Sequence, residues 1–223
     1  MLDQPITSKM LAEKDGAIGR IIFNNPARHN AVSLDMWQAV SQIMDDFNAD
    51  DRVRVIVLTG AGGKAFVSGA DISEFKEKRA SEEAAAEYAK ISESARVKLQ
   101  DTLKPTIAMI RGYCIGGGLA TAIACDIRIA AEGSRFGVPA AKLGLGYAYD
   151  GIKKLIDLVG PASANAPLTI RSAKVSVREA LKPESQRDLE LCKRLVAECF
   201  ASEDYTEGRT AFMEKRRPVF KGR

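Results

Sequence analysis

The sequence predicts an α/β protein with a largely parallel sheet, and three observations support that class. Segments with strand composition alternate along the chain with segments of helical periodicity, the order that builds α/β folds. Arg54–Thr59 is a continuous apolar run, as expected for a strand covered on both faces. Thr106–Ile110 is another apolar run, and it leads through the glycine triplet Gly116–Gly118 into the Ala-rich segment Leu119–Cys125. A strand is therefore expected to end where a buried helix begins.

The other expected elements follow in chain order. Ser33 is expected to cap a helix that runs to about Asn48, because apolar residues then recur on one helical face. A long surface helix is expected over Ser81–Leu103, ending before Pro105. Two further apolar segments are expected to be strands: Gly16–Asn24 and Asp126–Ala131. A low-charge loop and four helices complete the chain: Phe136–Gly151, then Ile152–Val159, Leu168–Leu181, Ser185–Ala201 and Thr206–Lys215.

The composition is that of a soluble globular protein. A chain of 223 residues suits one domain with a sizeable core. Hydrophobic residues make up 46% and charged residues 28%, both ordinary values. No apolar run approaches the ~20 residues that a membrane span requires. The first residues lack the basic start and apolar centre of a signal peptide. We therefore expect a cytoplasmic protein that does not bind membranes.

Cysteine spacing and charge exclude several kinds of site. The four cysteines form no CxxC pair and are expected to be reduced core thiols: Cys114, Cys125, Cys192 and Cys199. No metal site is expected, because His29 is the only histidine. The net charge of +4 is spread along the chain, and its longest basic run is Lys215–Arg217. Nucleic-acid binding is not expected, since only the charge supports it. No dinucleotide fingerprint or phosphate-loop motif is present.

Two glycine-rich segments are the candidate functional elements. At Gly116–Gly118 a strand is expected to meet a helix, where backbone N–H groups lack intrahelical partners and the helix dipole adds positive character. Without Cβ atoms, another molecule can approach these donors closely, which suits an anion or a developing oxyanion. The alternative is a tight turn that needs glycine only for packing. Gly60–Asp71 also follows a strand, so Ser68–Gly69 and the triplet are expected to offer one N–H each to a shared oxygen.

Four segments, in this order and over nearly the whole chain, resemble motifs of the enoyl-CoA hydratase/isomerase (crotonase) superfamily. They are an N-terminal loop, two oxyanion-loop motifs and a C-terminal tail: 25–31, 64–72, 112–130 and 212–222. The resemblance implies a crotonase-like spiral of ββα units in residues 1–160, with a C-terminal helical region in 161–223. It also implies an acyl-coenzyme A substrate, no other cofactor, and a homotrimer or a dimer of trimers.

The resemblance implies roles for individual residues. The N–H groups of Ser68 and Gly117 would hold the thioester oxygen and stabilise an enolate. Asp71 is expected to fix the loop by accepting backbone N–H bonds, and His29 to be a polar loop residue. The coenzyme A channel would be lined by residues of both loops: Arg28, Ala31, Lys64, Ala65, Phe66, Ser68, Gly69, Ala70, Asp71, Ile72, Gly116 and Gly117. In the tail, Phe212 and Lys215 would close the site near a neighbouring subunit.

This chain departs from the family at the positions of both catalytic glutamates. Hydratases carry one glutamate two residues beyond the glycine triplet, where this chain has Ala120. They carry the other after the proline that follows a Phe-Gly turn, and here Pro139 is followed by Ala140. Adding water to a double bond needs a positioned acid and base, and alanine supplies neither. Hydration is therefore not expected, and isomerisation is in doubt because isomerases generally keep the second glutamate.

Other reactions, and binding without turnover, remain open. The segment Leu143–Leu155 is similar to a loop of methylmalonyl-CoA decarboxylase-like members, in which a tyrosine aligns with Tyr147. Decarboxylation requires only enolate stabilisation and a proton donor, although those members keep a carboxylate where Ala120 stands. Asp150 lies close to the place of a nucleophilic aspartate in dehalogenase-like members. The alternatives are loop packing for Tyr147, a solvated carboxylate for Asp150, and an acyl-CoA-binding protein that catalyses nothing.

The chain is also short between two motifs. Gly160–Leu168 joins segments that family members separate by a few dozen residues, which hold a helix and a strand over the acyl pocket. Either a segment near residues 162–165 is absent from this sequence, or the protein carries a true deletion. We favour the first, because a helix that begins at Ile152 and stops after Gly160 would leave apolar pocket surface uncovered. The acyl group is not specified by the sequence.

Overall fold

The structure, a computed structural model, describes residues 6–74, 82–139, 149–159, 167–216 and 218–222. The chain divides into two compact units, Met1–Gly137 and Val138–Arg223. Each unit has its own buried residues. The predicted division at residue 160 falls outside the described ranges and stays a prediction.

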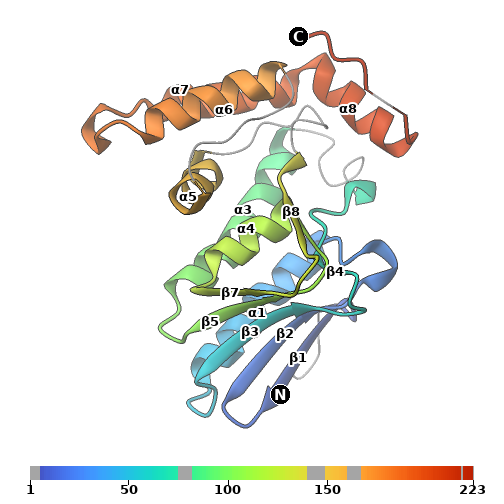
Figure 1. The fold of residues 1–223 in the computed structure, drawn as a ribbon, viewed down its shortest axis with the longest axis vertical. Coiled ribbons are helices and arrows are strands. Elements are labelled where there is room, and N and C mark those ends of the chain that lie inside the picture. Colours follow the sequence, from blue (N-terminus) through green and yellow to red (C-terminus); the bar gives the residue numbers. More distant parts are fainter. Residues whose placement is uncertain (1–5, 75–81, 140–148, 160–166, 217, 223) are drawn as a thin grey trace. The chain divides into compact units, whose positions relative to one another are not determined.

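The first unit contains two sheets, and their strands are mostly parallel as predicted (Figure 1). The five-stranded sheet has the order β1-β2-β3-β5-β7, in which only β1 and β2 pair in an antiparallel manner. Its strands are Met10–Asp15, Ile18–Phe23, Val55–Gly60, Thr106–Ile110 and Ile127–Ala130. The second sheet has three parallel strands, β4 (Ala65–Val67), β6 (Tyr113–Ile115) and β8 (Arg135–Gly137).

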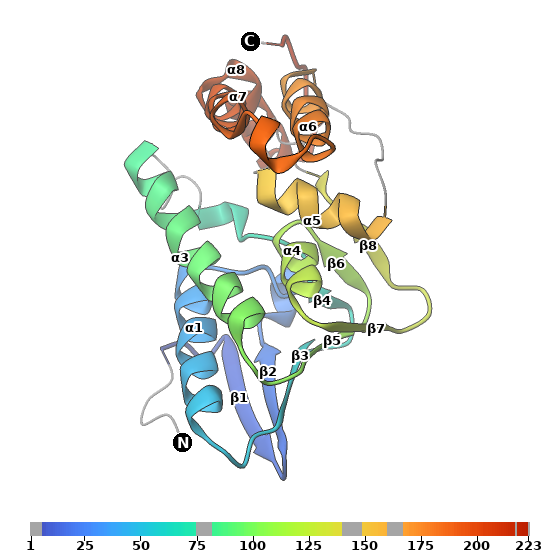
Figure 2. The same ribbon diagram turned by 90° about the vertical axis from the view of Figure 1, so that its left-hand side faces the viewer.

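In its described residues the first unit also contains the α-helices α1 (Leu34–Ala49), α3 (Glu82–Asp101) and α4 (Gly117–Ala124). Figures 1 and 2 show α1 and α3 side by side, with α1 against the strands β1 and β2. The predicted apolar face of α1 is confirmed, because Trp37, Met44 and Phe47 are all buried. Ser33 lies at the N-cap position, but its hydroxyl contacts the Asp35 carboxylate and accepts no backbone bond from the helix.

The second unit is helical, as the sequence predicts. Its α-helices are α5 (Tyr149–Val159), α6 (Pro167–Ala180), α7 (Leu189–Ala201) and α8 (Glu203–Met213). A short 3₁₀ turn, η4 (Glu184–Gln186), lies between α6 and α7, which pack side by side (Figure 2). The side chains of Asp188 and Ser202 accept backbone N–H bonds at the starts of α7 and α8. These two caps fix where each of the last two helices begins.

The prediction of buried, unpaired thiols is confirmed. All four cysteines are free and buried. Burial raises the pKa of Cys114 and of Cys125 to about 12, so both remain protonated at neutral pH. None of the helices in the described ranges is long and apolar enough to cross a membrane. Nor do three potential metal ligands gather in that part of the chain.

Candidate functional site

The two glycine-rich segments meet at one end of the small sheet. Strands β4 and β6 are parallel neighbours. β4 therefore leads into a first bend, Ser68–Asp71, beside the point where β6 leads into a second bend, Gly116–Gly118. A Cβ atom on Gly118 would lie only 2.2 Å from the Val67 carbonyl oxygen, and one on Gly116 would lie 3.8 Å from the Cα of Gly69. The two bends therefore pack directly on each other, and the absence of a side chain at Gly118 permits this approach.

The Gly117 amide of the second bend has no acceptor within α4. The Gly116 N–H donates to the Gly137 carbonyl at 2.8 Å. Gly117 is the first residue of α4, and an N–H at that position has no acceptor within the helix. A Cβ on Gly117 would lie 3.9 Å from the Ala70 nitrogen. The backbones of Gly117 and Ala70 are thus near neighbours across the two bends.

The Ser68 amide, which the sequence predicts to supply the partner donor, is already paired in this structure. The Ser68 N–H already donates to the His29 carbonyl at 3.2 Å, and the Asp71 N–H donates to the Val32 carbonyl at 2.9 Å. Among the described residues the Ala70 N–H, which lies between them, has no acceptor. Sequence reasoning placed Ala70 only in the coenzyme A channel. Hydrogen bonds between the first bend and residues 29–32 identify its amide, because they use the N–H groups of Ser68 and Asp71 and leave that of Ala70.

A buried asparagine anchors the N-terminal loop that holds the first bend. Asn30 is fully buried, and its amide nitrogen donates to the carbonyls of Ala65 (2.8 Å) and Ala61 (3.0 Å). Its side-chain oxygen accepts the Asn25 N–H at 2.9 Å. The backbone of Asn30 is left-handed, with φ 56°, a conformation that asparagine tolerates better than most residues. One side chain therefore joins the N-terminal loop to both ends of the segment that leads into β4.

Asp71 fixes the far end of the first bend and binds Arg28. Its carboxylate accepts the Ser73 N–H at 3.1 Å, which fixes the turn into the short helix η2 (Ile72–Glu74), as expected for this residue. The Arg28 Nη1 donates to the two Asp71 oxygens at 2.9 and 3.1 Å. The Asp71 side chain is almost buried, whereas the Arg28 side chain remains 55% exposed. Part of the guanidinium is therefore accessible to a ligand.

The remaining predicted site residues have different environments. Lys64 is exposed, Ala31 and Ile72 are half-buried, and Gly69 is buried in the first bend. Ala65 and Phe66 are buried in β4, and the Phe66 ring packs against Phe23 with centroids 5.9 Å apart. Both side chains belong to the core, so only their backbone groups can face a ligand. That these residues line the coenzyme A channel stays a prediction.

The structure describes Ala120, one of the two positions at which a catalytic glutamate is predicted to be missing. Ala120 lies in the first turn of α4, half-buried, and its N–H donates to the Gly116 carbonyl at 3.0 Å. No carboxylate extends from this turn beside the two bends. Ala140 and Tyr147 lie outside the described residues. Asp150 is part of α5, and its side chain is likewise outside the description.

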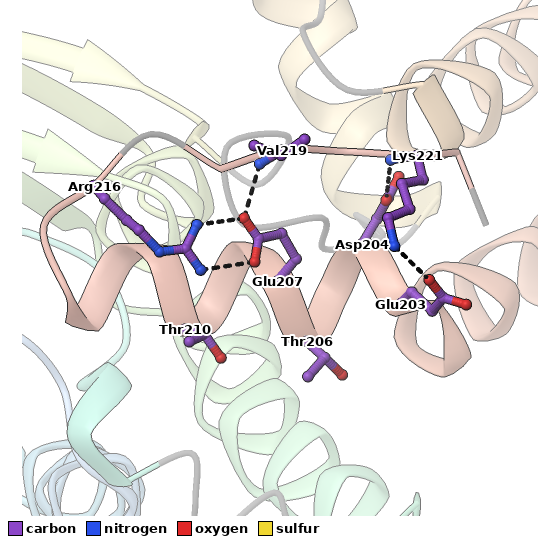
Figure 3. Close-up of a pocket in the computed structure, with 8 residues that line it drawn as sticks. All are labelled: Glu203, Asp204, Thr206, Glu207, Thr210, Arg216, Val219 and Lys221. Carbon is purple, nitrogen blue, oxygen red and sulfur yellow. Dashed lines mark hydrogen bonds and ion pairs between the residues drawn. The ribbon is translucent and has the colours of Figure 1, made fainter.

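The C-terminal tail is tied to α8 by two carboxylates, as Figure 3 shows. Glu207 accepts two bonds from the Arg216 guanidinium, at 2.5 and 2.8 Å, and one from the Val219 N–H at 2.8 Å. The buried Asp204 accepts the N–H groups of Lys221 (2.6 Å) and Gly222 (2.8 Å). These groups line a cavity of about 540 Å³ within the second unit.

The predicted tail residues Phe212 and Lys215 also belong to the second unit. The Phe212 ring is half exposed, and Lys215 is exposed with a left-handed backbone, φ 56°. Their part in a site near a neighbouring subunit stays a prediction.

Replacing Glu207 by glutamine is expected to release the tail. The Arg216 guanidinium and the Val219 N–H lower the pKa of Glu207 from its ordinary 4.5 to about 2. The contribution of this carboxylate is therefore complete above pH 4.5 and is lost as the pH falls through about 2. In Glu207→Gln at neutral pH, the Val219 amide should exchange with deuterium about tenfold faster. Glu190→Gln, which removes an exposed pair with Lys193 on α7, is the matched control and should leave that rate unchanged.

Comparisons with known proteins identify the family that this chain is similar to. Residues 13–169 match the protein-family model described as Enoyl-CoA hydratase/isomerase. A Short-chain-enoyl-CoA hydratase from Clostridium acetobutylicum is 28% identical over 253 residues, covering 94% of this chain and 96% of the relative. A crystal structure of an enoyl-CoA hydratase/carnithine racemase from Magnetospirillum magneticum is 28% identical with a TM-score of 0.67, covering 97% of each chain. A methylmalonyl-CoA decarboxylase has a TM-score of 0.73 at 22% identity, covering 97% of this chain and 99% of its own, and shares the fold.

The alignment lengths bear on the predicted shortfall. The alignment with the Clostridium acetobutylicum relative extends over 253 residues, more than the 223 residues of this chain. That relative therefore carries residues that have no counterpart here. The place of the gap near residues 162–165 stays a prediction.

Proposed function

Because the chain belongs to the enoyl-CoA hydratase/isomerase family, we propose that it binds an acyl-CoA thioester whose carbonyl oxygen accepts the N–H groups of Ala70 and Gly117. The observation that carries this proposal is the close approach of these two backbones, with a Cβ position on Gly117 only 3.9 Å from the Ala70 nitrogen. The Ser68 and Gly116 amides on either side are already bound to other carbonyls.

The arrangement favours an enolate over a neutral thioester. Both donors are backbone amides held by packed elements, and one begins a helix whose dipole adds positive character. Negative charge that develops on the carbonyl oxygen therefore strengthens both hydrogen bonds. Removing one such donor typically raises the barrier by about 3 kcal/mol. The reaction we propose is accordingly one that passes through an enolate of the acyl group.

Coenzyme A would lie along the N-terminal loop and the first bend. The exposed cations Arg28 and Lys64 would face its phosphates, and backbone groups of Ala65 and Phe66 would form hydrogen bonds with it. Phe212 and Lys215 would close the site in a homotrimer or a dimer of trimers. Light scattering of the purified protein tests the assembly, and a monomer would contradict it.

Hydration of crotonyl-CoA is expected to be negligible. The first turn of α4 carries Ala120, so no carboxylate there can deliver a proton or activate water. Incubation with crotonyl-CoA, monitored by the loss of enoyl absorbance, should show a kcat far below ~1 per second. Turnover at or above that rate would contradict the assignment of Ala120 to the missing glutamate.

Decarboxylation is the reaction that the remaining residues favour. Loss of CO₂ from a malonyl-type thioester leaves the enolate without any general base, so the chain needs only the amide pair and a proton donor. We propose Tyr147 as that donor, with Asp150 as the alternative acid/base or nucleophile. Turnover of malonyl-type thioesters would support the role of Tyr147, and turnover of haloacyl-CoA thioesters would support Asp150 as the nucleophile. Tyr147→Phe should stop decarboxylation while coenzyme A binding persists. Binding without turnover of either class would assign the chain as a non-catalytic acyl-CoA-binding protein.

A further inference from the structure

Two buried aromatic residues outside the bends form a relay of hydrogen bonds. The Trp37 indole N–H, from α1, donates to the Tyr88 hydroxyl of α3 at 3.1 Å. The Tyr88 hydroxyl donates in turn to the Val32 carbonyl at 3.2 Å. Trp37 is 2% exposed and Tyr88 3% exposed, so solvent does not compete for these bonds. The relay therefore connects two helices to one backbone group of the N-terminal loop.

Val32 is the residue that holds the first bend. Its N–H donates to the Gly69 carbonyl at 2.8 Å, and its own carbonyl accepts the Asp71 N–H at 2.9 Å. These two bonds hold Gly69 and Asp71, the residues on either side of Ala70. The Val32 carbonyl uses its two lone pairs for the Asp71 N–H and the Tyr88 hydroxyl. A displacement of the Tyr88 hydroxyl would therefore shift the acceptor that fixes the Ala70 amide.

The same indole lies beside Gly117 in the second bend. Its Cζ2 atom lies 3.7 Å from the Cβ position of Gly117, an ordinary van der Waals distance. The Arg96 guanidinium lies over the indole, 5.4 Å from the ring centroid, and restrains the ring further. Trp37 therefore borders the space beside Gly117 that a side chain would fill, and it reaches the residues around Ala70 through the Tyr88 hydroxyl and Val32.

We propose that Trp37 and Tyr88 are positioning residues that set the separation and direction of the Ala70 and Gly117 amides. This inference rests on the proposed function, because it concerns the same thioester carbonyl. Stabilisation of an oxyanion depends on donors that are fixed before the charge develops, and small displacements weaken it strongly. One indole thus starts the relay that ends at Val32 and also lies beside Gly117, so a displacement of that indole would change the spacing of the two donors.

The test separates carbonyl polarisation from affinity. Acetyl-CoA carrying ¹³C at the carbonyl is bound to the full chain, and difference infrared spectroscopy measures the fall in the carbonyl stretching frequency. Tyr88→Phe removes one hydroxyl and keeps the ring. We expect it to bind acetyl-CoA within about twofold of the wild-type affinity, since the coenzyme A contacts are untouched, but to lose most of the frequency shift.

A second variant and a control complete the design. Trp37→Phe should lose the shift as well, and the double variant should lose no more than the worse single variant, because both break the same relay. Leu99→Val removes a buried methylene group from α3, takes no part in the relay, and should keep the full shift.

Each outcome has one interpretation. Absence of binding or of a frequency shift in the wild-type protein would overturn the proposed function itself. A full shift in Tyr88→Phe and in Trp37→Phe, or additive losses in the double variant, would overturn the positioning role alone. Equal losses in Leu99→Val would assign the effect to general loosening of α3 and also overturn it. If Tyr88→Phe does not fold, Trp37→Phe against Leu99→Val decides the question.

Discussion

Gly118→Ala is expected to unfold the second bend, whereas Gly117→Ala is expected to fold and lose thioester binding. A Cβ on Gly118 would lie 2.2 Å from the Val67 carbonyl oxygen and 2.7 Å from the Val67 Cβ. Both atoms belong to the buried strand β4 and cannot move aside without breaking the pairing of β4 with β6. We expect Gly118→Ala to lower the free energy of unfolding by about 4 kcal/mol.

The neighbouring glycine provides the matched comparison. The nearest atoms to a Cβ on Gly117 are Trp37 Cζ2 at 3.7 Å and the Ala70 nitrogen at 3.9 Å, both ordinary contacts. Alanine also suits the first turn of a helix, so stability should stay within about 1 kcal/mol of wild type. The new methyl group would lie between Gly117 and the Ala70 nitrogen, so we expect it to hinder a carbonyl oxygen that must reach both amides. Urea denaturation and titration with acetyl-CoA check the pair, and wild-type binding by Gly117→Ala would contradict the proposed position of the oxygen.

Asn30→Ala is expected to cost about 3–5 kcal/mol of stability. The substitution removes the side-chain partner of one buried group, the Ala65 carbonyl, and of two partly buried groups, the Ala61 carbonyl and the Asn25 N–H, at roughly 1–3 kcal/mol each before relaxation. It also places alanine at φ 56°, where a side chain with a polar group is better tolerated.

Asn24→Ala is the control for this prediction. Its side chain makes an exposed bond to the Ser8 carbonyl, and its loss should change stability by about 0.5 kcal/mol or less. Thermal and urea unfolding of both variants provide the measurement. A similar small loss in Asn30→Ala would show that the N-terminal loop does not depend on this side chain.

The parts of the fold that could be predicted from sequence are those governed by local patterns. Thr106–Ile110 is the observed strand β5, and the glycine triplet does lead into a helix, because an apolar run, a glycine turn and an Ala-rich segment adjoin in the chain. Strand β1 was missed because five of its six residues are exposed, which leaves no alternating apolar pattern. Strands β4 and β6 were missed because each has only three residues.

The site itself could be predicted only in part. That two small-residue bends approach each other follows from their positions after parallel strands. Which amide of the first bend stays unpaired depends on contacts with His29 and Val32, some forty residues away in the chain. The local sequence therefore does not distinguish the Ser68 amide from the Ala70 amide. The relay from Trp37 to Tyr88 is equally non-local. Periodicity placed Trp37 on the apolar face of α1 without indicating its partner.

A crystal structure with a non-reactive acyl-CoA bound tests the central claim most directly. We predict that the thioester oxygen lies roughly 2.7–3.1 Å from both the Ala70 and the Gly117 nitrogens, with the Ser68 N–H still bonded to the His29 carbonyl. A carbonyl oxygen held by other groups, or a Ser68 amide that leaves His29 to bind the thioester, would contradict the account.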